Sequence, residues 1–172
     1  MATATLQSIR GMPMENAFSH IRNFRQVTPA LATSGQPSEN DLKAIAQAGY
    51  EVVINLALHD DPRYSLADEP GEVRALSMTY VHIPVQFNRP TGEDLDAFFN
   101  AFDQHRHRKV WVHCAANYRV SAFVGLYRAV REGWERERAF ELMHSIWQPN
   151  DYPAAFQVWM DFIEKQLQRQ KD

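Results

Sequence analysis

The stretch KVWVHCAANYRVS, residues 109–121, joins a strand to a helix through a short loop. Its first part, Lys109–His113, is rich in β-branched and aromatic residues, which predicts a buried strand. Apolar residues with helical spacing follow from Val120 onwards and predict a helix that begins near Arg119. In open α/β sheets, ligands bind where strands end and helices begin. Cys114 therefore lies at the expected binding edge.

Strand and helix patterns alternate along the rest of the chain. Short apolar runs predict further strands at Leu31–Thr33, Glu51–Ala57 and Tyr80–Val85. Helical patterns occur at Glu15–Phe24, Ser38–Gly49, about residues 71–77, Thr91–Phe102, and in three segments around residues 120–127, 140–147 and 156–163. The alternation predicts an α/β fold with helices packed on a sheet that is at least partly parallel. The aromatic side chains of Trp147–Pro153, between the last two helices, could line one wall of a ligand pocket or pack in the core, and packing is expected.

The length and composition of the chain predict a single domain. With 172 residues, of which 45% are hydrophobic, the chain can bury one core of ordinary size. Residues 1–14 are polar and contain no apolar segment, so they are expected to form a flexible leader. The domain is then expected to span residues 15–172.

Charge and cysteine content restrict the partners and the compartment. A formal net charge of −3 argues against nucleic acid or an anionic membrane surface as the main partner. No run approaches the ~20 apolar residues of a membrane span. A single cysteine cannot form an internal disulfide, which suits the cytoplasm. Since the histidines lack metal-ligand spacing, no metal or other cofactor is predicted.

Cys114, Arg119 and Ser121 carry the side chains needed for nucleophilic attack on an anion. A helix N-terminus and a guanidinium together lower the pKa of a thiol by several units, so Cys114 is expected to be an ionised nucleophile. Arg119 could bind two phosphate oxygens with its planar fork, and Ser121 could donate a hydrogen bond to the departing thiolate. The rest of the predicted anion-binding loop comprises His113, Ala115, Ala116, Asn117, Tyr118 and Val120. The competing interpretation is that the cysteine is a small buried hydrophobe.

His113-Cys114 followed by Arg119 and Ser121 resembles the signature loop of protein tyrosine and dual-specificity phosphatases. With residues 33–38 (TSGQPS), 53–56 (VINL) and 82–85 (HIPV), it is similar to a bacterial family of tyrosine-phosphatase-like proteins, over about residues 31–147. The resemblance implies the compact phosphatase fold, with a central, mostly parallel sheet of four to five strands flanked by helices. It also implies a phosphocysteine on Cys114, no metal, and a phosphorylated small molecule or phosphoprotein as substrate.

The sequence departs from the phosphatase pattern in its loop. The usual loop has five residues between cysteine and arginine, whereas only Ala115–Tyr118 intervene here. If the arginine already lies on the helix, moving it one position earlier rotates it by ~100°. The loop also lacks glycine, which restricts how tightly it can fold around an anion.

A further departure concerns the general acid, which is normally an aspartate on a neighbouring loop. Glu93 and Asp94 follow the strand that ends at Val85, but at the start of a helix they are expected to interact with the helix dipole. The remaining candidates lie on another loop and are Asp60, Asp61, Asp68 and Glu69. The sequence offers no basis for choosing among them.

Two other functions fit the same residues. The six-residue span from Cys114 to Arg119 also resembles the active loop of rhodanese-type sulfurtransferases, in which a cysteine persulfide carries sulfur and no general acid is needed. His113 and the Gly35–Pro37 segment favour the phosphatase over this alternative. A third function is a non-catalytic module in which the shortened loop binds an anion or a phosphopeptide without turnover.

Overall fold

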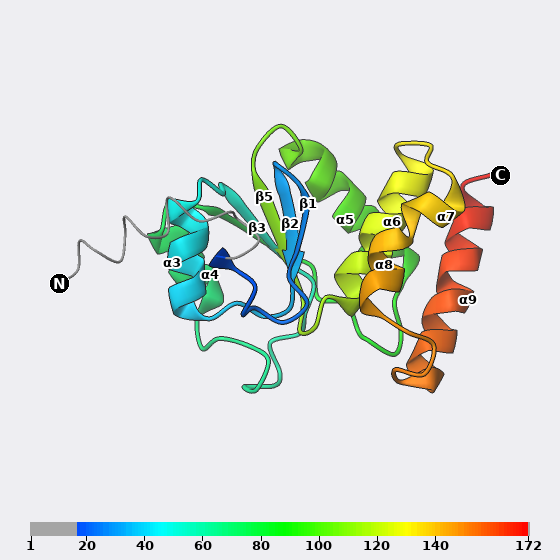
Figure 1. Cartoon of the computed structure of the whole chain (residues 1–172), viewed down its shortest axis with the longest axis horizontal. Coiled ribbons are helices and arrows are strands. Elements are labelled where there is room, and N and C mark those ends of the chain that lie inside the picture. Colours follow the sequence, from blue (N-terminus) through cyan, green and yellow to red (C-terminus); the bar gives the residue numbers. More distant parts are fainter. Residues whose placement is uncertain (1–16, 172) are drawn as a thin grey trace.

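A five-stranded sheet forms the centre of the protein, in the order β1-β2-β5-β3-β4 (Figure 1). The structure is a computed structural model and describes residues 17–171. The strands are β1 (Arg25–Thr28), β2 (Leu31–Ser34), β3 (Val52–Asn55), β4 (Thr79–His82) and β5 (Val110–His113). Only the β1–β2 pair is antiparallel, and the other neighbours pair in parallel. The predicted α/β class and mostly parallel sheet are confirmed, while the predicted leader, residues 1–14, lies outside the described residues.

Helices cover both faces of this sheet (Figure 1). On one face lie α3 (Glu39–Gln47) and α4 (Glu69–Ala75). On the other face α5 (Gly92–His105) and α6 (Tyr118–Val130) pack against the strands. Three further helices pack against α6, namely α7 (Arg136–Ala139), α8 (Glu141–Ile146) and α9 (Pro153–Arg169).

Neighbouring strand residues point alternately into two hydrophobic cores. Val110 and Val112 of β5 belong to the core under α5, α6 and α9, whereas Trp111 belongs to the core under α3 and α4. The side chains of β3 also point alternately into the two cores: Val52 and Ile54 lie with Val110 and Val112, and Val53 lies with Trp111. A strand buried on both faces has few polar positions, which is why these strands read as continuous apolar runs in the sequence.

The predicted helix ends are confirmed at three places. Ser38 and Asp41 form a reciprocal capping box at α3, and Thr91 and Asp94 form another at α5. Gly49 follows α3 with a φ of +94°, a left-handed conformation that glycine adopts without strain.

Several predicted boundaries are wrong. Residues 18–23 form turns instead of the helix expected at Glu15–Phe24, and β1 was not predicted. β4 ends at His82 rather than Val85, and the helix expected over residues 71–77 begins two residues earlier, because Asp68 caps it. The helix expected over residues 140–147 is present as α8, but the short α7 before it was not predicted.

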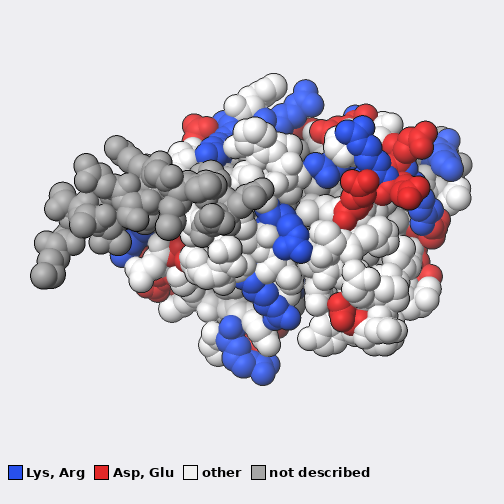
Figure 2. Space-filling model, in the orientation of Figure 1, with Lys and Arg blue, Asp and Glu red and all other residues white. Residues whose placement is uncertain are grey.

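Charged side chains are intermixed by sign on part of the surface. Figure 2 shows Lys, Arg, Asp and Glu side chains side by side over the region of α7 and α9. One such pair, Arg136 and Glu164, links these two helices, and Arg169 pairs with Asp96 at 2.6 Å. Exposed pairs of this kind contribute at most about 1 kcal/mol each. Within residues 17–171, no helix is long and apolar enough to cross a membrane.

Candidate active site

Cys114 lies between the end of β5 and the first turn of α6. The backbone N–H of Cys114 donates to the Ser34 carbonyl at 3.3 Å, which continues the pairing of β5 with β2. α6 begins at Tyr118, and its first internal hydrogen bond runs from Ser121 N–H to the Asn117 carbonyl at 3.0 Å. The first N–H groups of a helix have no partner inside the helix, so they are available to an anion next to Cys114.

The loop after Cys114 is held against the loop after β2. Gln36 N–H donates to the Ala115 carbonyl at 3.2 Å, and Gly35 forms a β-bridge with Ala116. A Cβ on Gly35 would lie only 2.6 Å from the Ala115 carbonyl oxygen. Glycine is therefore required at position 35 by the close approach of two backbones.

Asn117 has a left-handed backbone conformation in this loop. Its φ is +69°, and its side chain is fully buried. The Nδ2 atom donates to the Asn23 carbonyl at 2.8 Å and to the Thr33 hydroxyl at 2.9 Å. These bonds fix the turn that aims the start of α6 at Cys114.

The loop opens onto a cavity of about 240 Å³. Cys114 is only 1% exposed and lies in its wall. The lining residues are Arg22, Tyr64, Phe87, Cys114, Ala115, Ala116, Tyr118, Arg119 and Tyr152. The cavity thus combines a thiol, two guanidinium groups and four aromatic rings.

A backbone carbonyl and an aromatic ring hold the Arg119 guanidinium in place. The side chain is 8% exposed, and its Nη1 donates to the Val85 carbonyl at 2.8 Å. The guanidinium carbon lies 5.8 Å from the centre of the Phe87 ring. Its Nε is buried and has no hydrogen-bond partner among residues 17–171. Despite the shortened spacing, Arg119 lines the same cavity as Cys114 and retains unsatisfied donor capacity for an anion.

Aromatic side chains from four separate segments line the cavity. Tyr118 stacks on Trp147 with ring centres 4.8 Å apart, and Phe87 stacks on the same indole at 5.6 Å. Tyr152 meets the ring of Tyr118 edge-on at 6.0 Å. The expectation that the aromatic residues near Trp147 only pack is confirmed for Trp147, which is fully buried. It is wrong for Tyr152, which is 58% exposed and lines the cavity.

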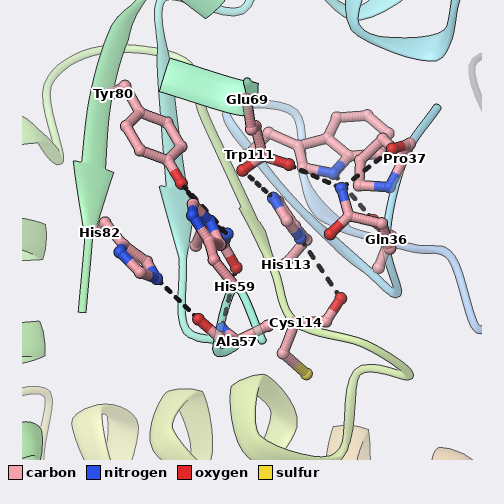
Figure 3. A network of polar contacts seen from close by, with 12 residues as sticks. Gln36, Pro37, Ala57, His59, Glu69, Tyr80, His82, Trp111, His113 and Cys114 are labelled. Atoms are coloured by element: carbon pink, nitrogen blue, oxygen red, sulfur yellow. Dashed lines mark hydrogen bonds and ion pairs between the residues drawn. The ribbon is translucent and has the colours of Figure 1, made fainter. Parts of the chain in front are cut away.

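Behind the loop, His113 is bonded to a buried carboxylate (Figure 3). His113 Nε2 lies 2.9 Å from Glu69 Oε2, and Gln36 Nε2 donates to Glu69 Oε1 at 2.6 Å. Burial alone would raise the pKa of Glu69, but the charge of His113 and the hydrogen bonds to the carboxylate lower it to about 2. Glu69 is therefore an ionised acceptor beneath the loop rather than a proton donor within the cavity.

Val120 and Ser121 of the predicted site are buried and do not line the cavity. Val120 is buried in the core, so only its backbone can face the loop. The Ser121 hydroxyl is also fully buried and donates to the Tyr118 carbonyl at 3.1 Å.

The other candidate acids also lie outside the cavity. Asp94 and Asp68 accept hydrogen bonds from backbone N–H groups at the starts of α5 and α4. Hydrogen bonds from Arg63 lower the pKa of Asp61, which keeps it ionised. Among the described residues, no carboxylate lines the cavity.

Arg22, Tyr64 and Phe87 line the cavity without having been recognised in the sequence. Phe87 follows β4 at the same edge of the sheet as Cys114, and this position is the one signal that the sequence carries for it. Arg22 precedes β1, and its carbonyl accepts a hydrogen bond from Gly35 N–H at 2.7 Å. No local pattern identifies Arg22 because it reaches the cavity only through this tertiary contact.

Residues 16–152 match the family model described as DSP-PTPase phosphatase fused to NAD+ kinase. The chain belongs to this family. A DUF442 protein from Shewanella putrefaciens CN-32, a candidate phosphatase of known crystal structure, is 34% identical to this chain. Its TM-score is 0.73, and the alignment covers 91% of this chain and 96% of that chain. The relationship to phosphatases predicted from the sequence is confirmed.

A curated relative of this chain is the dual specificity protein phosphatase TpbA of Pseudomonas aeruginosa. It is 28% identical over 123 residues, which make up 70% of this chain and 53% of TpbA. The chain therefore spans about half the length of this relative. The crystal structure of P. aeruginosa TpbA in complex with pTyr has the same fold, with a TM-score of 0.65 and 17% identity over 87% of this chain and 91% of that chain.

Proposed function

We propose that this protein hydrolyses phosphate monoesters through a phosphocysteine on Cys114. The proposal depends on one observation: Cys114 and Arg119 line one cavity at the N-terminus of α6. A phosphate in this cavity would face the unpaired N–H groups of the helix and the free Nε of Arg119. Both kinds of donor stabilise a thiolate and the negative charge of the transition state.

The reaction follows in two steps. The Cys114 thiolate attacks phosphorus, an S–P bond forms, and the ester P–O bond breaks. The leaving oxygen takes a proton from water, because no carboxylate of the described residues lines the cavity. A second water then attacks phosphorus, the S–P bond breaks, and inorganic phosphate leaves. The proton of this attacking water goes to the hydroxide that remained after the first step. Ser121 donates to the departing thiolate in the second step, after its hydroxyl has left the Tyr118 carbonyl.

The cavity favours an aromatic phosphate over an aliphatic one. Four of its lining residues are aromatic, and rings stack favourably on rings. A phenol, with a pKa of about 10, also leaves more readily without a carboxylic acid than an aliphatic alcohol does. The TpbA complex with pTyr supports the same class of substrate.

A paired assay of the wild type and Cys114→Ser tests this function. We expect the wild type to release phosphate from p-nitrophenyl phosphate faster than from glycerol phosphate. Cys114→Ser should lower the rate by at least about a thousandfold, because the nucleophile is lost. Equal phosphate release by both proteins would contradict the proposal.

The same two proteins distinguish the other functions. Cysteine-dependent formation of thiocyanate from thiosulfate and cyanide, without phosphate release, would identify a sulfurtransferase. Binding of inorganic phosphate by both proteins, without either activity, would identify a binding module.

A further inference from the structure

Both ring nitrogens of His113 face hydrogen-bond acceptors. Nε2 lies 2.9 Å from Glu69 Oε2, and Nδ1 lies 3.3 Å from the carbonyl oxygen of Cys114. Neutral imidazole carries one N–H and one lone pair. A neutral His113 would therefore point a lone pair at an oxygen on one side or the other. Two donated hydrogen bonds require a proton on each nitrogen.

Glu69 is surrounded by donors. Its two oxygens face His113 Nε2 and Gln36 Nε2, and the Tyr80 hydroxyl interacts with the same carboxylate. A protonated carboxylic acid would need an acceptor for its own proton, whereas a carboxylate accepts all three. The side chains of Glu69 and His113 are 1% and 0% exposed. The contacts thus describe a buried ion pair.

The imidazole lies between the carboxylate and Cys114 (Figure 3). The positive member of the pair is consequently the one closer to Cys114. Water screens charges weakly in such a buried place, so a short electrostatic interaction is strong there. The donated Nδ1–H also fixes the orientation of the Cys114 peptide group.

We propose that Glu69 is a positioning residue for the thiol: it keeps both nitrogens of His113 protonated, and the resulting imidazolium stabilises the Cys114 thiolate. The inference rests on the proposed function, since it takes Cys114 as the nucleophile. It assigns to Glu69 a role in place of proton donation to the leaving group. Glu69 acts on the reaction only through His113.

The other titratable groups around the pair leave this arrangement intact. Burial, and next the Glu69 carboxylate, raise the pKa of Tyr80 on β4, so its hydroxyl remains a neutral donor. Burial, and next His82 on β4, lower the pKa of His59 in the loop after β3, which favours its neutral form. On the cavity side, Arg119 of α6 and Arg22 face Cys114. They would remain in every variant below.

Glu69→Gln tests the proposal, because it keeps the shape of the side chain and removes its charge. The rate of Cys114 alkylation by iodoacetamide is measured against pH, and the midpoint of the curve reports thiolate formation. We expect the midpoint to rise by about one pH unit, a tenfold loss of thiolate below the midpoint. Glu72→Gln makes the same chemical change one turn later on α4 and should leave the midpoint where it is. An unchanged midpoint in Glu69→Gln would overturn the proposal.

Two further measurements separate this role from simple structural support. In a His113→Asn background, adding Glu69→Gln should not shift the alkylation midpoint again. An equal shift in that background would show that Glu69 acts without His113 and would refute the relay. If Glu69→Gln does not fold, ¹⁵N NMR of the wild-type protein tests the proposal by reporting the protonation of each histidine nitrogen. Both ring nitrogens of His113 should carry a proton, as its two hydrogen-bond acceptors require. A neutral ring would overturn the proposal.

The test does not depend on turnover. Alkylation and NMR report the thiol and the imidazole even if the wild type releases no phosphate. A wild-type protein that releases no phosphate would therefore refute the proposed function alone. An alkylation midpoint that does not shift in Glu69→Gln would refute the role of Glu69 alone.

Discussion

Asn117 Nδ2 donates a hydrogen bond to the hydroxyl of Thr33, 2.9 Å away. Thr33 lies in β2, and Asn117 precedes the first residue of α6. The bond therefore ties the start of the helix to a strand 84 positions earlier in the chain. Together with the bond to the Asn23 carbonyl, it holds the backbone of Asn117 in a left-handed conformation.

Replacing Asn117 should destabilise the protein in two separable ways. Asn117→Gly keeps the left-handed backbone and removes both side-chain bonds, so we expect a loss of about 1–3 kcal/mol in the free energy of unfolding. Asn117→Ala should lose about 1 kcal/mol more, because alanine is strained at this φ. Urea unfolding of the three proteins measures both differences. A more stable Ala variant than Gly variant would contradict this account.

Gly35→Ala should disturb the loop that contains Cys114. The added Cβ would lie 2.6 Å from the Ala115 carbonyl oxygen, so one of the two loops must move. We expect kcat/KM for p-nitrophenyl phosphate to fall by about tenfold to a hundredfold, since small displacements of catalytic groups have effects of that size. Gly133→Ala is the control, because its φ is also positive but no atom lies near its Cβ position. It should lower stability without changing kcat/KM.

Arg119→Lys should not preserve activity. Lysine keeps the positive charge but lacks the planar fork that binds two oxygens. We expect kcat/KM for p-nitrophenyl phosphate to fall by about a hundredfold or more, as for the loss of a transition-state donor. Arg131→Lys at the end of the same helix should leave the rate near that of the wild type. Wild-type kinetics in Arg119→Lys would show that a point charge is sufficient.

Tyr152→Ala should weaken the binding of aromatic substrates. Tyr152 is exposed at the cavity and interacts edge-on with Tyr118 and Phe87. An aromatic contact contributes about 0.5–1.5 kcal/mol, so KM for p-nitrophenyl phosphate should rise about threefold to tenfold. The KM for glycerol phosphate, which has no ring, should rise less. Val158→Ala, another exposed apolar position that does not line the cavity, is the control, and an equal effect there would exclude a specific contact.

The buried Glu69 should make stability depend on pH in the acid range. Its pKa falls from 4.5 to about 2 in the folded protein. Because the folded-state pKa is the lower one, its stabilising effect is fully present above about pH 4.5 and is lost as the pH falls toward 2. The difference in unfolding free energy between the wild type and Glu69→Gln should be largest above pH 4.5 and narrow below it. A constant difference over this range, measured by denaturant unfolding, would contradict the ion pair.

Much of the fold could be predicted because its signals are local. β3 and β5 are buried on both faces, so their sequences are continuous runs of apolar residues. Ser38 and Thr91 mark the starts of helices because their own side chains cap them. β1 escaped prediction because it is an edge strand with one apolar residue, Val27, in its four. Such a strand is recognisable only by its pairing with β2.

The sequence alone predicts where the candidate nucleophile lies, because Cys114 follows a buried strand directly and Arg119 follows within one short loop. The surroundings of these two residues depend on the tertiary fold. Glu69 looked like a candidate acid of the cavity, and it lies instead beneath His113. Arg22 and Tyr152, from opposite ends of the chain, meet at the cavity. These positions depend on how the loops after parallel strands converge at one edge of a sheet, and no short-range pattern in the chain encodes that convergence.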